Sequence, residues 1–358
     1  SILESDENIL NVVKEETLEI KNNYADARRT KIDYSISVNL SKRDILDFIE
    51  DKQVLVMLTS QNYIKRIPLD TYHQQQRGGR GVIGMTTKEE DEVSTVVLTS
   101  THDNLLCFTD IGRAYWLNVY EIPEGTRQSK GKAIVNLLNL KNENVLAVIP
   151  LRTYDSDKYI FYATQRGRVG KMSEKLFSHP NSGGIKAINI LNNDKLIRIM
   201  VTNGSNDVVL TTKQGKSLRF SETNVRATLR GGQGVIGMRL KADDCVKDMT
   251  LIEKDHLLIV TEKGFGKRTS FDEFRGHGRG TMGVINIKTN ENRGNVVSAL
   301  AVNDNDDLVI TTLNGVVMRT KSSGISIQKR GTQGVKVIKV DNNDKVASIT
   351  IVPSDNNK

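Results

Sequence analysis

The sequence is poor in the residues that build chemical sites and covalent staples. Its 358 residues include two cysteines, Cys107 and Cys245, which lie far apart and outside any C-x-x-C, so it predicts neither a disulfide framework nor a zinc site. The five histidines show no metal-ligand spacing, and neither G-x-S-x-G nor H-E-x-x-H occurs. We therefore expect no catalytic residue, no bound metal and no cofactor in this chain.

Long apolar runs and nucleotide motifs are missing as well. No run approaches the roughly 20 apolar residues of a membrane span, and the first ten residues are acidic, unlike a signal sequence. The tetrapeptide QGKS (214–217) resembles the end of a P-loop, yet the first glycine of that motif would fall on Leu210. These absences predict a cytoplasmic protein without a membrane partner or a nucleotide.

Charge is unevenly divided along the chain. Residues 1–50 hold seven basic and eleven acidic residues, a net charge of −4. Since the whole chain has a net charge of +8, residues 51–358 carry +12. A strongly basic part of this size indicates a polyanion as partner.

The first 50 residues have helical character. Ile9, Val13 and Ile20 fall near one helical face, with Ser5 as a helix cap and acidic residues in the first turn. We expect this helix to fade at Asn22 and Asn23. The domains predicted are a helical head with a linker, residues 1–35, and an all-β domain, residues 36–358.

From residue 54 onward the sequence repeats. Six apolar runs end in Asn62, Gly112, Gly167, Gly215, Gly264 and Gly315, and a threonine stands three positions before each end. Glycine and asparagine tolerate the positive φ of a tight hairpin turn. A basic strand follows each turn, another glycine comes about 20 residues later, and an apolar strand closes each unit of about 50 residues. Repeats of this length with about four strands each predict a propeller-like ring of six blades that stack face to face.

Basic residues recur at fixed positions of the repeat. The fourth residue after the turn is Arg66, Trp116, Lys171, Arg219, Arg268 and Arg319, and the first is Arg113, Arg168 and Lys216 in three units. Ordinary solvent-facing positions on outer strands would also explain this pattern. A belt of cations around a ring, however, suits a curved polyanion such as duplex DNA, so we predict DNA contact at the basic residues of these positions and at Lys65 and Lys267.

Glycine-rich loops add further candidates. They contain Arg77 and Arg80 in the first unit, and Arg230, Arg279 and Arg330 in later units. Glycine lets backbone amides approach a phosphate, although turn geometry alone would explain most of these glycines. Contacts of this kind read phosphate, so binding should be sequence-tolerant and steeply salt-dependent, with a log–log slope of about −0.9 per phosphate neutralised.

One loop carries a resemblance to a known family. QRGGRGV (76–82) is similar to the seven-residue box of the C-terminal domain of the DNA gyrase A protein, and residues 62–85 resemble the first blade of that domain. Residues 24–32 resemble the segment that leaves the breakage-reunion core of type IIA topoisomerases. The box positions are Gln76, Arg77, Gly78, Gly79, Arg80, Gly81 and Val82, and the other five loops depart from the motif.

The resemblance implies a six-bladed β-pinwheel whose blades exchange strands and around which DNA wraps. It also implies that this chain is the DNA-binding part of a gyrase A protein, which forms a heterotetramer with the gyrase B protein. ATP and Mg²⁺ would be bound elsewhere in that enzyme, and the DNA-cleaving tyrosine would lie outside this chain. The isolated domain would be monomeric. Two alternatives stay open: the equivalent domain of the A-type protein of topoisomerase IV, and a propeller used as a protein-interaction platform.

Overall fold

The computed structural model divides the chain into two compact units, Ser1–Phe48 and Ile49–Lys358. The described residues are 6–26, 45–59, 61–68, 93–126, 129–155, 157–313, 317–341 and 343–352. The predicted domain boundary between residues 35 and 36 and the predicted box at residues 76–82 both lie outside these ranges.

The first unit contains the helix α1 (Asp6–Tyr24), as the sequence predicts. Asp6 and Glu7 occupy its first turn, where carboxylates favour the positive end of the helix dipole, and Lys21 lies in its last turn. No residue of α1 is buried, so the face that carries Ile9, Val13 and Ile20 is exposed.

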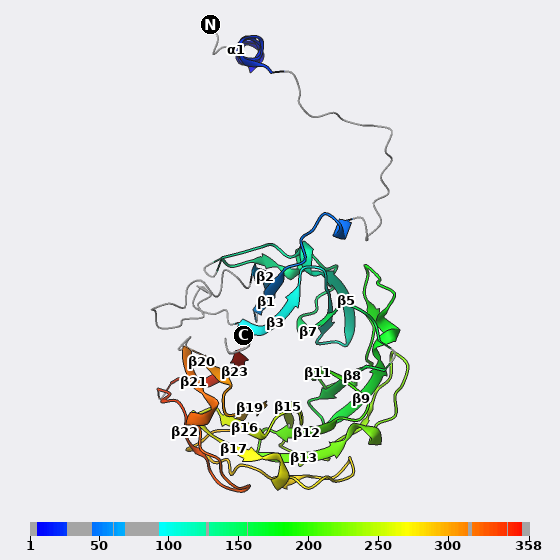
Figure 1. The fold of residues 1–358 in the computed structure, drawn as a ribbon, viewed down its shortest axis with the longest axis vertical. Coiled ribbons are helices and arrows are strands. Elements are labelled where there is room, and N and C mark those ends of the chain that lie inside the picture. Colours follow the sequence, from blue (N-terminus) through cyan, green and yellow to red (C-terminus); the bar gives the residue numbers. More distant parts are fainter. Residues whose placement is uncertain are drawn as a thin grey trace. The chain divides into compact units, whose positions relative to one another are not determined.

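The second unit is a ring of six antiparallel sheets, seen along its axis in Figure 1. Three long strands of each blade come from one repeat and lie in the order inner, middle, outer. They are β3 (Val93–Ser100), β1 (Gln53–Thr59), β2 (Tyr63–Pro68); β7 (Val145–Leu151), β4 (Asn104–Thr109), β5 (Arg113–Asn118); β11 (Leu196–Thr202), β8 (Tyr159–Thr164), β9 (Arg168–Ser173); β15 (Val246–Leu251), β12 (Asp207–Thr212), β13 (Lys216–Ser221); β19 (Val296–Val302), β16 (His256–Thr261), β17 (Phe265–Ser270); and β23 (Val346–Val352), β20 (Asp307–Thr312), β21 (Val317–Lys321).

A two-residue strand at the outer edge of each of the first five blades is supplied by the following repeat. These strands are β6 (Lys132–Ala133), β10 (Ile185–Lys186), β14 (Val235–Ile236), β18 (Val284–Ile285) and β22 (Val335–Lys336). Among the described residues the sixth sheet has three strands. The four-stranded blades and the strand exchange are confirmed, whereas the expectation that one repeat forms one whole sheet is corrected, because each repeat lends its short strand to its predecessor.

The hydrophobic cores lie between neighbouring blades. Alternate side chains of a strand point to opposite faces of a sheet, so Leu105 and Cys107 of β4 pack toward the first blade while Leu106 and Phe108 pack toward the third. Five such clusters are found among the described residues, one at each junction from the first blade to the sixth. The predicted face-to-face stacking of blades is confirmed.

The hairpin turns explain the threonine and glycine that mark each repeat. The hydroxyl oxygen of Thr164 accepts a hydrogen bond from the amide of Arg168 at 3.1 Å, and the same bond recurs at Thr59, Thr109 and Thr212. The described turn residues adopt positive φ, from 61° at Asn62 to 85° at Gly215. The QGKS segment forms the turn between β12 and β13 and the first two residues of β13.

Short 3-10 helices follow the outer long strands. They are η2 (Val119–Glu121), η4 (Glu174–Phe177), η5 (Glu222–Asn224), η6 (Phe271–Glu273) and η7 (Ser322–Gly324), and η3 (Ile134–Asn136) follows β6. A 3-10 turn leaves backbone carbonyls without helical partners. Carbonyls at η2 and at η4 to η7 accept hydrogen bonds from side chains of the preceding blade.

Candidate nucleic-acid interface

In the first five repeats, the fourth residue after the turn donates a hydrogen bond to a carbonyl at the 3-10 turn of the next repeat. Trp116 Nε1 donates to the carbonyl of Phe177 at 2.9 Å, and Lys171 Nζ donates to that of Glu222 at 3.1 Å. Arg219 Nη1 lies 3.2 Å from the carbonyl of Phe271. We call Arg66, Trp116, Lys171, Arg219 and Arg268 the inter-blade donors; Arg66 bonds Val119 at 3.4 Å and Arg268 bonds Ile325 at 2.7 Å.

Carboxylates complete the surroundings of these cations. Arg268 is buried and also pairs with Asp304, Lys171 lies 3.5 Å from the buried Glu222 carboxylate, and both Nε and Nη2 of Arg219 donate to Asp207. A buried charge is stable only when ion pairs and hydrogen bonds replace its hydration. The interpretation of the fourth position as a solvent-facing belt is therefore corrected at Lys171 and Arg268, whose side chains are turned into the blade junctions.

Arginines at the first position after the turn donate hydrogen bonds to the glycine-rich loop of the next repeat. Arg113 Nη2 donates to the carbonyl of Gly183 at 2.5 Å, and Arg168 donates to Gln233 at 2.9 Å and to Gly234 at 2.7 Å. These arginines hold the loops that carry the short outer strands. Lys216 is half-buried, and its contact with DNA stays a prediction.

The third position holds two fully buried lysines. Lys65 Nζ donates to the carbonyls of Thr126 and Ser129 at 2.9 and 2.8 Å, and Lys267 Nζ donates to that of Lys329 at 2.7 Å. Burial lowers the pKa of Lys65, and it lowers the pKa of Lys267 to about 8, with the Arg330 charge adding to the shift. With no side-chain surface left, neither lysine can meet a phosphate in this conformation, so their assignment to a surface belt is corrected.

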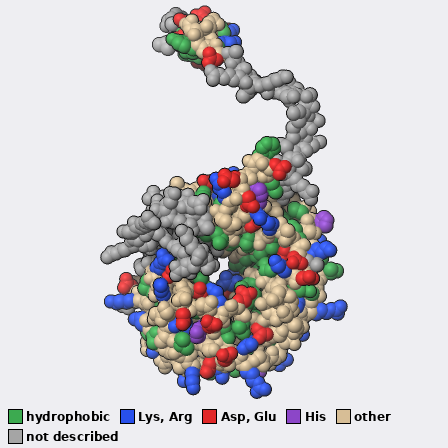
Figure 2. Space-filling model, in the orientation of Figure 1, with side chains coloured by type: hydrophobic (Ala, Val, Ile, Leu, Met, Phe, Trp, Pro, Cys, Tyr) green, Lys and Arg blue, Asp and Glu red, His purple; other side chains and the backbone are tan. Residues whose placement is uncertain are grey.

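Three arginines of the predicted set lie at the same position of three equivalent loops. The rim loops, residues 230–234, 279–283 and 330–334, each read Arg-Gly-x-x-Gly and lead into the outer strands β14, β18 and β22. Arg230, Arg279 and Arg330 are exposed. Figure 2 shows lysine and arginine side chains projecting along the rim of the ring.

Each rim loop docks on the preceding repeat in the same way. The amides of Gly231, Gly280 and Gly331 donate to the carbonyls of Ala187, Gly237 and Asn286, at 2.8, 2.6 and 2.7 Å. Parallel bridges join Ile188 to Gly232, Met238 to Thr281 and Ile287 to Thr332. The three arginines are thus repeated by the architecture of the ring, one blade apart.

The glycines that follow these arginines face open space. Gly231, Gly280 and Gly331 have φ of 80°, 79° and 71°, and a Cβ at Gly231 or Gly331 would meet no heavy atom within 4 Å. The turn glycine Gly264 differs, because a Cβ there would overlap the carbonyl oxygen of Ile338. The bare backbone of the rim loops leaves room for a ligand as large as a phosphate.

Arg319 and the box complete the predicted set. Arg319 Nη2 donates to Asp307 Oδ2 at 2.7 Å within its own blade. Gln76, Arg77, Gly78, Gly79, Arg80 and Gly81 lie outside the described residues. DNA contact at all of these positions stays a prediction.

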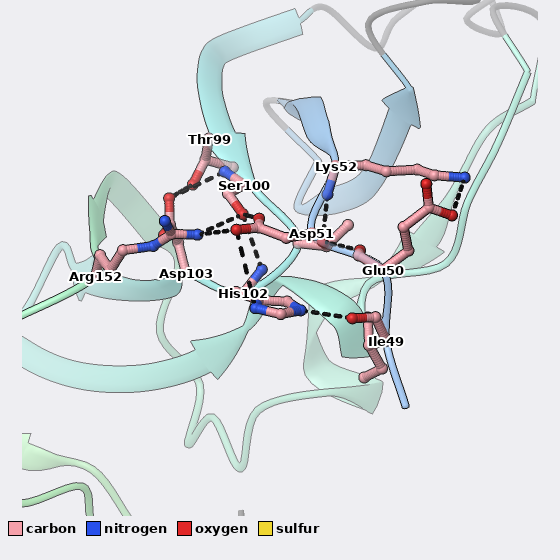
Figure 3. Close-up of polar contacts among 10 residues, drawn as sticks. Ile49, Glu50, Asp51, Lys52, Thr99, Ser100, His102, Asp103 and Arg152 are labelled. Carbon is pink, nitrogen blue, oxygen red and sulfur yellow. Dashed lines mark hydrogen bonds and ion pairs between the residues drawn. The ribbon is translucent and has the colours of Figure 1, made fainter. Parts of the chain in front are cut away.

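A polar network that sequence reasoning missed fixes the start of the ring (Figure 3). Arg152, just after β7, donates to Asp51 at 2.7 Å and to Asp103 at 3.0 Å, and Asp51 also accepts from Ser100 Oγ. The bond from Ser100 and the Arg152 guanidinium lower the pKa of the Asp51 carboxyl. A ring nitrogen of His102 lies 2.6 Å from the carbonyl of Ile49. The segment before β1 is thus fastened to the first two blades.

Features typical of metal-binding and membrane proteins are not found in the described residues. Within those ranges, no group of three or more histidine, cysteine or acidic side chains could hold a metal ion. Cys107 and Cys245 are free thiols. No described helix is long and apolar enough to cross a membrane.

The fold and the rim loops define a class: six-bladed propellers whose blades exchange strands and carry cationic loops on the outer rim. A family model described as DNA gyrase C-terminal domain, beta-propeller, matches residues 53–100, 103–152, 158–203, 206–252, 255–303 and 306–353, one match for each blade. The chain belongs to this family.

Relatives agree with the family. The DNA gyrase A protein of Salmonella typhimurium is 40% identical over 347 residues, covering 96% of this chain and 39% of that protein. The DNA gyrase A protein of Staphylococcus aureus strain COL is 38% identical over 360 residues, covering 99% of this chain and 40% of that protein. The chain therefore spans about two fifths of the length of these curated relatives.

Two solved structures have the same fold. A DNA gyrase A C-terminal domain aligns with a TM-score of 0.71 at 28% identity, covering 84% of this chain and 99% of that one. The C-terminal domain of a DNA topoisomerase IV aligns with a TM-score of 0.71 at 26% identity, covering 85% of this chain and 94% of that one. The family and the six-bladed fold predicted from the sequence are confirmed.

Proposed function

We propose that this chain binds duplex DNA along the outer rim of the ring and bends it around the blades. The observation that carries the proposal is the repetition of an exposed arginine in three equivalent rim loops, each on an outer edge of the ring. The positive charge of residues 51–358 supports it, since the remainder of the chain is acidic.

Repeated contacts are what bending a stiff polymer requires. Duplex DNA has a persistence length of about 150 bp, and curving a few tens of base pairs costs on the order of 10 kcal/mol. One patch would not offset that cost, whereas contacts spaced one blade apart share it along the arc. Contacts from arginine side chains and glycine amides to phosphate oxygens carry no sequence information, so binding through such contacts would be largely independent of sequence.

The proposed role in the whole protein follows from the family. We infer that this chain is the C-terminal part of a gyrase A protein, which works with the rest of that protein and with the gyrase B protein in a heterotetramer. Wrapping by this part would present DNA for strand passage, so that ATP-driven turnover introduces negative supercoils. The chain would itself catalyse nothing, with ATP and Mg²⁺ bound elsewhere in the enzyme, in the bacterial cytoplasm on the nucleoid.

The two alternatives differ from this proposal at specific features. The C-terminal domain of a topoisomerase IV has the same fold, but the intact QRGGRGV sequence at residues 76–82 favours gyrase. A protein-interaction platform would bind at the faces or centre of the ring, and the exposed arginines of the rim loops favour the perimeter instead.

A topology assay tests the proposal directly. The chain is incubated with nicked plasmid, the nick is ligated, and the topoisomers are separated after the protein is removed. Wrapping leaves a shift in linking number that grows with bound protein. An unchanged distribution at saturating protein, with binding verified by fluorescence anisotropy, overturns wrapping; an absence of binding overturns the DNA-binding function itself.

A further inference from the structure

The two-residue strands on the outer edges of the blades contain an exposed position that is basic in some blades and apolar in others. A glycine with positive φ precedes each of the strands β10, β14, β18 and β22, and the second residue after this glycine is exposed. These exposed residues are Lys186, Ile236, Ile285 and Lys336. Ile236 and Ile285 have 47% and 51% of their surface exposed. Lysine at this position suits a phosphate, whereas a branched aliphatic side chain does not.

Ile236 lies against the arginine-bearing loop of the next repeat, and Ile285 directly precedes Asn286, on which the following arginine-bearing loop docks. Arg279 Nη1 donates to the carbonyl of Ile236 at 3.0 Å, while its Nε donates to that of Asn224 at 2.9 Å. A Cβ on Gly280 would lie 4.0 Å from Cγ2 of Ile236, so this methyl group borders the bare face of the glycine. At the next junction, Gly331 donates to the carbonyl of Asn286, the neighbour of Ile285.

Each of these two junctions therefore combines a cation with an exposed apolar side chain. The guanidinium of Arg279 is held by two carbonyls, which reduces the side-chain entropy lost when its remaining N–H groups meet a phosphate. In a complex with a duplex, an apolar side chain beside a phosphate-binding group would face the sugars and base edges of a groove. Proteins that bend DNA use such aliphatic side chains to unstack base steps.

We propose that Ile236 and Ile285 enter a groove of the bound duplex and concentrate its bending at the two junctions between the third, fourth and fifth blades. This inference rests on the proposed function. Lys186 and Lys336 would hold phosphates at the other junctions, where the curvature is smoother. Flexible pyrimidine–purine steps would be preferred where the isoleucines contact the duplex, because these steps are the easiest to kink.

The test compares an Ile236→Ala/Ile285→Ala chain with the wild type and with Ile111→Ala. Ile111 is 51% exposed in the turn between β4 and β5 and is not part of a two-residue outer strand, so it matches the residue type and exposure. We expect the double variant to lose roughly half of the linking-number shift while its Kd for DNA changes less than about threefold, because the phosphate contacts remain. Ile111→Ala should leave both quantities unchanged.

A chemical probe separates a groove contact from a structural role. Permanganate oxidises unstacked thymines, and we expect thymines made reactive by the wild-type chain to become protected with the double variant. An Ile236→Lys/Ile285→Lys chain should bind more tightly at low salt without regaining the reactive thymines.

Three outcomes would overturn the inference alone, provided that the wild type shifts the linking number. They are a full shift with the double alanine variant, a full shift with the lysine variant, and no reactive thymine in the wild-type complex. A wild-type chain that produces no shift would instead overturn the proposed function and this inference with it.

Discussion

The indole Nε1 of Trp116 donates to the carbonyl of Phe177 at 2.9 Å, in the position where the other inter-blade donors are arginine or lysine. The property that these residues share is therefore an N–H donor long enough to reach the next 3-10 turn. Positive charge alone does not explain the position, because tryptophan supplies the same bond without it. The inter-blade donors therefore recur because they join neighbouring blades, and the exposed arginines of the rim loops are a separate set of residues.

Removing an inter-blade donor should destabilise the ring more than it weakens DNA binding. Arg268→Met leaves the Ile325 carbonyl and the Asp304 carboxylate without their donor, and we expect a loss of about 3 kcal/mol in unfolding free energy. Urea denaturation measures this loss. Arg230→Met is the control, since an exposed substitution of this kind costs about 0.5 kcal/mol or less, and equal losses would contradict the structural role.

Two glycines with similar φ should respond differently to alanine. Gly264 (φ 77°) and Gly231 (φ 80°) both adopt a left-handed conformation, which costs an alanine about 1–2 kcal/mol. A Cβ at Gly264 would also overlap the Ile338 carbonyl, whereas one at Gly231 would have no neighbour within 4 Å. Gly264→Ala should thus cost about 2 kcal/mol more than Gly231→Ala in thermal or urea unfolding. Similar costs would show that backbone strain alone sets both values.

Lys267 should make stability depend on pH in the alkaline range. Its pKa is about 8 in the folded chain, below the value of about 10.4 in an unfolded chain, so the unfolded state binds more protons between these values. Stability relative to a Lys267→Met variant should therefore rise as pH increases from about 8 to about 10. Urea midpoints of both proteins at several pH values measure the difference, and a constant difference would contradict the lowered pKa of Lys267.

The rim arginines should control the salt dependence of DNA binding. Arg230→Ala/Arg330→Ala should lower affinity and reduce the slope of log K against log salt by about 1.8, if each arginine neutralises one phosphate. Lys14→Ala/Lys21→Ala on α1 removes the same charge outside the ring and is the matched control. Fluorescence anisotropy over a salt series measures both; equal slopes for the two double variants would place the DNA elsewhere.

The box should affect wrapping more than affinity. Arg77→Ala/Arg80→Ala should reduce the linking-number shift more than it raises Kd, because the rim loops of the other blades still supply phosphate contacts. The Arg230→Ala/Arg330→Ala chain, with the same loss of charge, is the comparison. If the two variants lose wrapping and affinity in the same proportion, the box has no role beyond its charge.

The sequence by itself determined the ring. Short apolar runs, a glycine or asparagine at each turn and a threonine three positions earlier are local signals, so they predicted six repeats and the hairpins without tertiary information. The spacing of apolar residues near the start of the chain predicted the helix α1 in the same way. The box at residues 76–82 identified the family for the same reason, since a short motif is readable wherever it folds.

Only the tertiary structure decided which cations meet solvent. In the sequence, Lys65, Lys267 and Arg268 cannot be told apart from Arg230 and Arg330, since all are basic residues of a repeat. In the structure, Lys65, Lys267 and Arg268 are buried by the following repeat, whereas Arg230 and Arg330 are exposed on rim loops. Burial depends on which loop of the next repeat docks on a strand, and that contact joins residues about 50 to 60 positions apart. A repeat pattern shows that a position matters in every blade, whereas the partner of its side chain is set by the stacking of the blades.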